Sequence, residues 1–142
     1  MTASPSEPVE DAFQTSFPPR ADALVRARKA FSDWLRRRTQ GAVVDELEVV
    51  FSELAANAVD ASPDEADEVT GRAWCEGSDL VLDLANRTDP TMGSPPEARW
   101  DLADPLRTGG RGLVITEALV DSVEVTLEPG PRLVVRCRRR LE

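Results

Sequence analysis

Apolar residues recur at helical spacing in two long segments of the first half of the chain. In residues 21 to about 38, Leu24, Phe31 and Leu35 fall on one face, which is typical of an amphipathic helix. From about residue 43 to 61, a second apolar stripe is formed by Leu47, Val50, Phe51, Leu54 and Ala58. The pattern therefore predicts two consecutive helices that share a core. Gly41 is expected to close the first helix.

Alternating apolar and polar residues predict short strands in five places: Phe13–Phe17, Val69–Glu76, Leu80–Asn86, Val123–Leu127 and Leu133–Cys137. Turn-forming residues at 77–79 and 128–131 favour two hairpins. A third, apolar helix is predicted from Leu113 to Val120. This order predicts an α+β fold, a two-layer α/β sandwich in which three helices cover one face of a mixed, mainly antiparallel sheet.

Two stretches do not fit a regular element. Residues 1–12 are rich in Pro, Ser, Thr and Glu, and we expect a disordered tail before a single domain at 13–142. Residues 91–109 contain three prolines and two glycines without a usable period, which predicts a long loop. Loops of this length often serve as lids over a binding site.

Composition excludes several kinds of function. The formal charge of −9 argues against binding to a nucleic-acid backbone, which needs a basic face. The chain has no histidine, which removes histidine-based acid–base catalysis, metal ligation and phosphohistidine chemistry. No segment has the pattern of a signal peptide or a membrane span, so we expect a cytoplasmic protein without a membrane partner. Cys75 and Cys137 are expected to be reduced thiols, with a disulfide as the open alternative.

Glu53 and Asn57 stand out in the second predicted helix. They are four residues apart, so their side chains project from the same face, on or beside the buried side. A buried polar group without a partner costs about 1–3 kcal/mol, so we infer that this pair holds something. The alternative is that Asn57 is a structural amide bonded to a neighbouring loop.

Three polar segments follow one another in a fixed order: Glu53-x-x-x-Asn57-Ala, Leu82-x-Leu-x-Asn86-x-Thr88 and Gly110-Arg111-Gly112-Leu113. With these segments the chain resembles the histidine-kinase-like ATPase family, from about residue 13 to 138. The run from residue 110 to 125 is similar to the bacterial anti-sigma factor serine/threonine kinases of that family. The resemblance implies a Bergerat-type ATP-binding fold with ATP and Mg²⁺ as cofactors.

The resemblance assigns roles to these residues. Asn57 would supply an amide oxygen to Mg²⁺, which suits this hard, oxygen-binding cation. Glu53 would accept the proton of the attacking hydroxyl or water, as a catalytic base. Gly110, Gly112 and Leu113, at the start of a helix, would bring backbone N–H groups to the phosphates. Arg107 or Arg111 would reach the phosphates, although both are equally well explained as exposed arginines.

The middle segment departs from the family pattern. Where the family has Asp followed two residues later by Gly, this chain has Asn86 and Thr88. Asp83 alternates with Leu82 and Leu84 and is predicted to face away from the site. Asn86 keeps an acceptor oxygen, but exchanging a charged acceptor for a neutral one lowers affinity about tenfold. We therefore expect weakened adenine binding, with a degenerate pocket as the alternative.

The resemblance implies a regulatory protein with serine/threonine kinase activity toward an anti-sigma-factor antagonist. Its partners would be that antagonist and a sigma factor, with a homodimer as a possible assembly. The competing function is a non-catalytic binding module, in which nucleotide or partner binding is retained without phosphate transfer. An autophosphorylating sensor kinase is excluded for this chain, because it has no histidine to accept the phosphate.

Overall fold

The computed structural model describes residues 12–62, 64, 66–87 and 110–141, without the side chains of residues 111–113. The expected tail, the predicted lid, Thr88 and Arg107 therefore lie outside the described residues.

Five strands form one sheet in the order β1-β2-β3-β5-β4. Their bounds are β1 Phe13–Phe17, β2 Val69–Glu76, β3 Asp79–Arg87, β4 Ser122–Glu128 and β5 Arg132–Arg140. All four pairings of neighbouring strands are antiparallel, including the β3–β5 pairing, which joins the two hairpins. The sheet is therefore entirely antiparallel in the described part, and the mixed component of the prediction was wrong.

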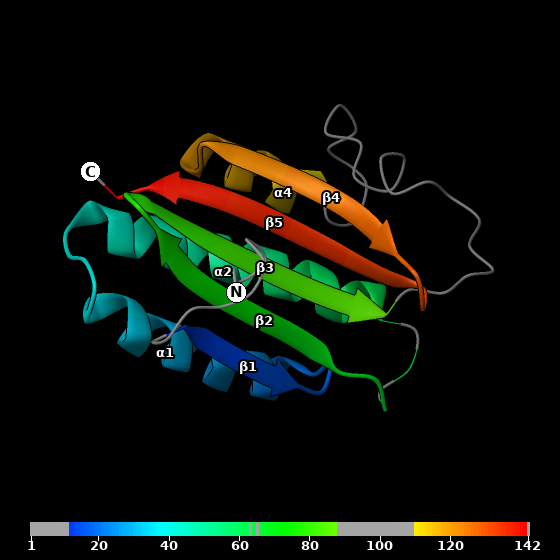
Figure 1. Cartoon of the computed structure of the whole chain (residues 1–142). Helices are drawn as coiled ribbons and strands as arrows, with labels where there is room; N and C mark the ends of the chain where they lie inside the picture. The colour runs from blue at the N-terminus through cyan, green and yellow to red at the C-terminus, as the bar shows by residue number, and fades with distance from the viewer. Residues whose placement is uncertain (1–11, 63, 65, 88–109, 142) are drawn as a thin grey trace, which may run out of the picture.

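Three described helices cover one face of this sheet: α1 Ala21–Arg36, α2 Ala42–Ala61 and α4 Gly110–Leu119. Figure 1 shows all three behind the sheet, with α2 between the other two. α2 contacts α1, α4, β2 and β3, so it is the central element of the helical layer. The predicted two-layer α+β sandwich is confirmed.

The core lies between this helical layer and the sheet. Its apolar stripes are those predicted from periodicity, and Phe31, Leu47, Val50 and Phe51 are completely buried. Phe31 stacks on Phe51 with ring centroids 4.8 Å apart, and Phe13 of β1 meets Phe31 edge-on at 5.5 Å. This aromatic cluster fixes α1 and α2 on the sheet.

Several predicted element ends shift in the structure. Gly41 does not close α1, which ends at Arg36; it lies directly before α2 with φ of 89°, a left-handed conformation that glycine adopts without a Cβ penalty. α4 begins at Gly110 rather than Leu113. The two glycines thus belong to the first turn of the helix instead of preceding it.

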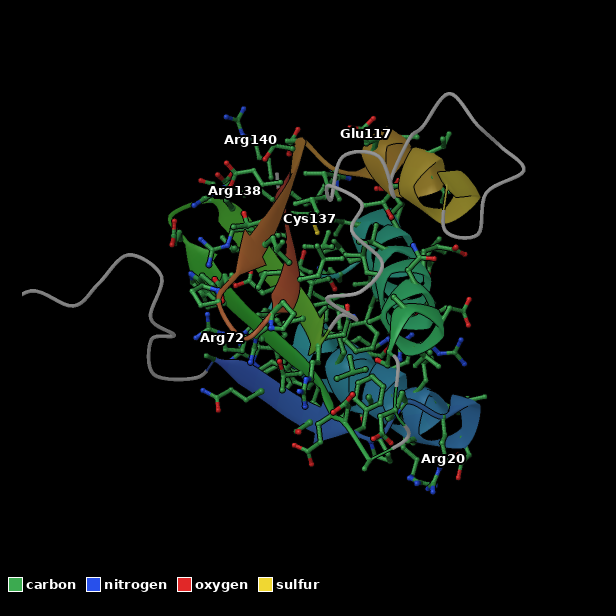
Figure 2. All side chains as sticks on the ribbon, turned by 90° about the vertical axis from the view of Figure 1, so that its right-hand side faces the viewer. Arg20, Arg72, Glu117, Cys137, Arg138 and Arg140 are labelled. Carbon is green, nitrogen blue, oxygen red and sulfur yellow. The ribbon has the colours of Figure 1, made fainter. Side chains whose placement is uncertain are left out.

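Both cysteines are free thiols, so the disulfide alternative is wrong. Cys137 is buried and lies between the sheet and the helices in Figure 2, whereas Cys75 is half-buried. Burial, together with the charge of Asp83, raises the pKa of the Cys137 thiol to about 12. None of the described helices is long and apolar enough to cross a membrane.

Candidate functional site

Asn57 is buried in the last third of α2, with only 8% of its surface exposed. Its position around the helix follows from Glu46, which forms an ion pair with Arg139 of β5. Asn57 follows Glu46 by eleven residues on the same helix. At about 100° per residue this is three full turns plus about 20°, so the two side chains project in nearly the same direction. Asn57 therefore faces the β5 flank of α2. The opposite flank packs on α1, where Arg28 contacts Ser52.

α4 lies on the same flank of α2 as β5. The two helices are in contact, and in Figure 1 α4 starts toward the end of the molecule that holds the last turns of α2. The first turn of α4, Gly110–Leu113, has backbone N–H groups without partners inside the helix. A buried amide and a glycine-bearing helix start on one flank fit a bound Mg²⁺ and phosphate group, as the resemblance implies.

Glu53 is placed differently from Asn57. It is partly exposed and lines a surface groove of about 670 Å³ between α1 and α2, together with Val25, Val49 and charged side chains. The i, i+4 spacing keeps the two side chains on adjoining strips of the helix surface, about 40° apart. Asn57 therefore occupies the buried side of the candidate site, and Glu53 its outer rim.

Asn86 ends the apolar face of β3 and is also buried, with 4% of its surface exposed. Its Nδ2 donates a hydrogen bond of 2.9 Å to the backbone oxygen of Arg87. One N–H of the amide is thereby used, and the side chain retains Oδ1 as an acceptor. In Figure 1 the end of β3 and the last turn of α2 reach the same end of the molecule.

Asp83 faces the opposite side of the sheet, as predicted from its alternation. Arg136 binds it through two hydrogen bonds, Nε to Oδ1 at 2.7 Å and Nη2 to Oδ2 at 2.8 Å. Arg72 adds a third bond at 3.4 Å, and Figure 2 shows its side chain on the sheet face away from the helices. These hydrogen bonds raise the pKa of the Arg136 guanidinium. Asp83 is therefore a structural anion that does not replace the missing aspartate.

The structure describes the remaining predicted residues only in part. Gly110, Arg111, Gly112 and Leu113 have helical backbone in α4, and the contacts of their side chains lie outside the described residues. The described residues contain no group of three or more Asp, Glu, Cys or His side chains arranged to hold a metal. A Mg²⁺ ion held by Asn57 would thus take most of its ligands from phosphate oxygens and water.

One polar residue near Asn86 was not predicted as a candidate from the sequence. Asp67, in the acidic loop before β2, has a buried oxygen, Oδ2, for which the described residues provide no hydrogen-bond partner. Neither spacing nor periodicity distinguishes Asp67 from its acidic neighbours in the sequence.

Helices packed on one face of an antiparallel five-stranded sheet, with a buried amide on the central helix, define a two-layer α+β domain. The model of the histidine kinase-like ATPase domain family matches residues 17–138. The chain therefore belongs to the histidine kinase-like ATPase domain family.

The structural comparisons agree with this assignment. Two nucleotide-free crystal forms of the catalytic domain of the histidine kinase ThkA superpose on the chain, each with a TM-score of 0.59. Sequence identity is 16% and 15%, and the alignments cover 91% of this chain and 96% of ThkA's domain. This likeness shows the fold. A comparison with curated proteins found no match.

Proposed function

We propose that the protein binds Mg·ATP between α2 and α4 and acts as an anti-sigma factor with serine/threonine kinase activity toward an anti-sigma-factor antagonist. The observation that carries the proposal is the buried Asn57 on the α4 flank of α2, in a chain of the ATPase domain family. The sigma factor and the antagonist, and a possible homodimer, belong to the proposal through the family resemblance.

Each residue has a role in this proposal. ATP would supply the γ-phosphoryl group: the bond between the γ-phosphorus and the β,γ-bridging oxygen breaks, and ADP leaves. Asn57 would offer its amide oxygen to Mg²⁺, and the first-turn N–H groups of α4 would bind the phosphates. Glu53, at the rim, is accessible to a hydroxyl on a protein partner and accepts its proton as the new O–P bond forms.

Two observations also favour the non-catalytic alternative. Asn86 is a neutral amide that already donates to the backbone of Arg87. Glu53 is held by none of the ion pairs found among the described residues, so none of the described cationic side chains orients it as a base. Nucleotide or partner binding without phosphate transfer is compatible with both features.

Thermal unfolding with and without Mg·ATP tests the binding step. Nucleotide at about 100 times its Kd is expected to add about 2.7 kcal/mol to the free energy of unfolding. Asn57→Ala should abolish this increment, whereas Ser52→Ala, on the α1 flank of the same helix, should keep it. Because each variant is compared with itself, any intrinsic loss of stability cancels. No increment in the unmodified protein at millimolar nucleotide would contradict the proposal.

Phosphate transfer needs a separate experiment. The protein is incubated with γ-labelled Mg·ATP and a candidate antagonist, and label on the antagonist is measured. Glu53→Gln is expected to lose this label while it keeps the ligand-induced stabilisation. Absence of label from every antagonist tried, with binding retained, would leave the non-catalytic function in place of the kinase.

A further inference from the structure

A hollow at one end of the sheet lies beside Asn86. It has a volume of about 440 Å³ and is lined by the loop before β2, the end of β3 and the turn between β4 and β5. Its polar lining includes Asp67, Glu68, Asn86 and Arg87. In Figure 1 these segments meet where the β3 arrow ends.

Asp67 is the unusual member of this lining. Its side chain is only 13% exposed, and its Oδ1 lies 3.6 Å from Nη1 of Arg87, whose own side chain is 62% exposed. That distance exceeds a normal hydrogen bond. Its Oδ2 is buried with no hydrogen-bond partner, the only carboxylate oxygen of the described residues in that condition. A carboxylate acceptor that lacks donors is destabilising unless a ligand provides one.

The neighbouring carboxylate, Glu68, is already satisfied. Its Oε1 accepts a hydrogen bond of 2.7 Å from the hydroxyl of Ser16 on β1. Two acidic residues in sequence thus differ in what they offer a ligand. Asp67 has a vacant acceptor, and Glu68 is used to connect the loop to β1.

The register brings the start of β2 beside the end of β3. Thr70 pairs with Ala85, so Val69 lies opposite Asn86. Asp67 lies in the loop two residues before Val69, and it lines the same hollow as Asn86. Because the terminal torsion of an aspartate is broad, either oxygen can turn toward the hollow.

We infer that Asp67 supplies the carboxylate that recognises the amino group of the adenine base. The inference rests on the proposed function, and it assigns to the loop before β2 a role that the family pattern gives to the end of β3. Asn86 then acts as a second, neutral acceptor through Oδ1. Two acceptors that line one hollow favour a base edge that carries an amino group.

The test asks whether removing the Asp67 carboxylate weakens only a nucleotide that carries the 6-amino group. Affinities for Mg·ATP and Mg·ITP are measured by calorimetry for the unmodified protein, Asp67→Ala and Glu68→Ala. ITP differs from ATP at the base, where an oxo group replaces the 6-amino group. Both variants remove one negative charge from the same hollow, so general electrostatics are matched. Removal of an unsatisfied carboxylate should not impair folding, which thermal unfolding checks.

We expect Asp67→Ala to weaken ATP about tenfold or more with little change for ITP, because only ATP loses a charge-assisted hydrogen bond. Glu68→Ala should leave the ATP to ITP ratio unchanged. An unchanged ratio in Asp67→Ala, with ATP still bound tightly, would overturn the inference and leave the proposed function intact. If the unmodified protein binds neither nucleotide, both fall together.

A GTP titration of the same three proteins distinguishes the amino group of adenine from that of guanine. A preference for GTP that depends on Asp67 would also overturn the assignment to adenine.

Discussion

Asp83 and Asn86 stand three positions apart on β3 and face opposite sides of the sheet. The carboxylate that would have suited the adenine of an ATPase is on the wrong face, where three hydrogen bonds from two arginines use both its oxygens. Strand alternation alone separates the two roles, and it allowed this difference to be predicted from the sequence.

Replacing Asp83 by alanine is expected to destabilise the fold by about 3 kcal/mol, because two guanidinium groups lose a buried counter-ion. The loss should stay at the low end for a buried pair, since Arg136 and Arg72 are 25% and 38% exposed and can turn toward water. Urea unfolding measures it. Asp79→Ala is the control: Asp79 is 37% exposed and 3.9 Å from Arg138, so it should cost less than about 1 kcal/mol. Equal losses in the two variants would contradict the structural role of Asp83.

Cys137 predicts a dependence of stability on pH. Its pKa rises from 9.0 to about 12 on folding, first because of burial and then because of Asp83. Above pH 9 the unfolded chain releases this proton and the folded chain keeps it, so stability should fall between about pH 9 and 12, by up to about 1.4 kcal/mol per pH unit. Urea unfolding at several pH values measures the slope, and the chain has no tyrosine to complicate it.

Cys137→Ala should flatten this slope, whereas Cys75→Ala, at the half-buried thiol, should change it less. The same slope in Cys137→Ala as in the unmodified protein would show that the thiol is not the group responsible.

At the scale of elements, periodicity predicted more than capping did. The five strands and the two long helices followed from apolar spacing, and β1 and β2 match their predicted bounds. Gly41 was predicted to close the first helix, but it lies directly before α2. Gly110 was predicted at the start of a helix from Leu113, and that helix begins three residues earlier, at Gly110 itself. A single sequence does not show whether a glycine between two helices ends the first helix or precedes the second. The sequence also gave no signal for Asp67. This residue stands out only in the structure, where its buried Oδ2 has no hydrogen-bond partner among the described residues.

Gly71 of β2 lies close to the side chain of Thr15 on β1. A Cβ built on Gly71 would lie 3.1 Å from Cγ2 of Thr15 and 3.5 Å from Cδ1 of Leu84. Gly71→Ala should therefore cost about 1–3 kcal/mol through overpacking beneath the helices. Thr15→Ser removes the nearest methyl group, so in the double variant the cost of the alanine should shrink. Thermal unfolding of the four proteins of this cycle measures the coupling, and strictly additive losses would contradict the contact.

At the scale of the whole molecule, α2 connects the candidate site to the rest of the fold. It contacts both other described helices and the two central strands β2 and β3, and it carries Glu53 and Asn57. A ligand that joins α2 to α4 stabilises the folded state against openings that separate these two helices, and does little for openings that leave them together. The position of the ligand is therefore readable from which backbone amides it protects.

Hydrogen exchange with and without Mg·ATP makes this measurable. We expect slower exchange in the last turns of α2 and in α4. We expect no comparable change in β1 or in the exposed face of α1, which lie at the edge of the fold opposite α4. Asn57→Ala should remove the protection in α2 and α4 together, because both depend on one bound group. Protection confined to α1 and the groove beside Glu53 would instead place the ligand between α1 and α2, in contradiction to the site proposed on the α4 flank.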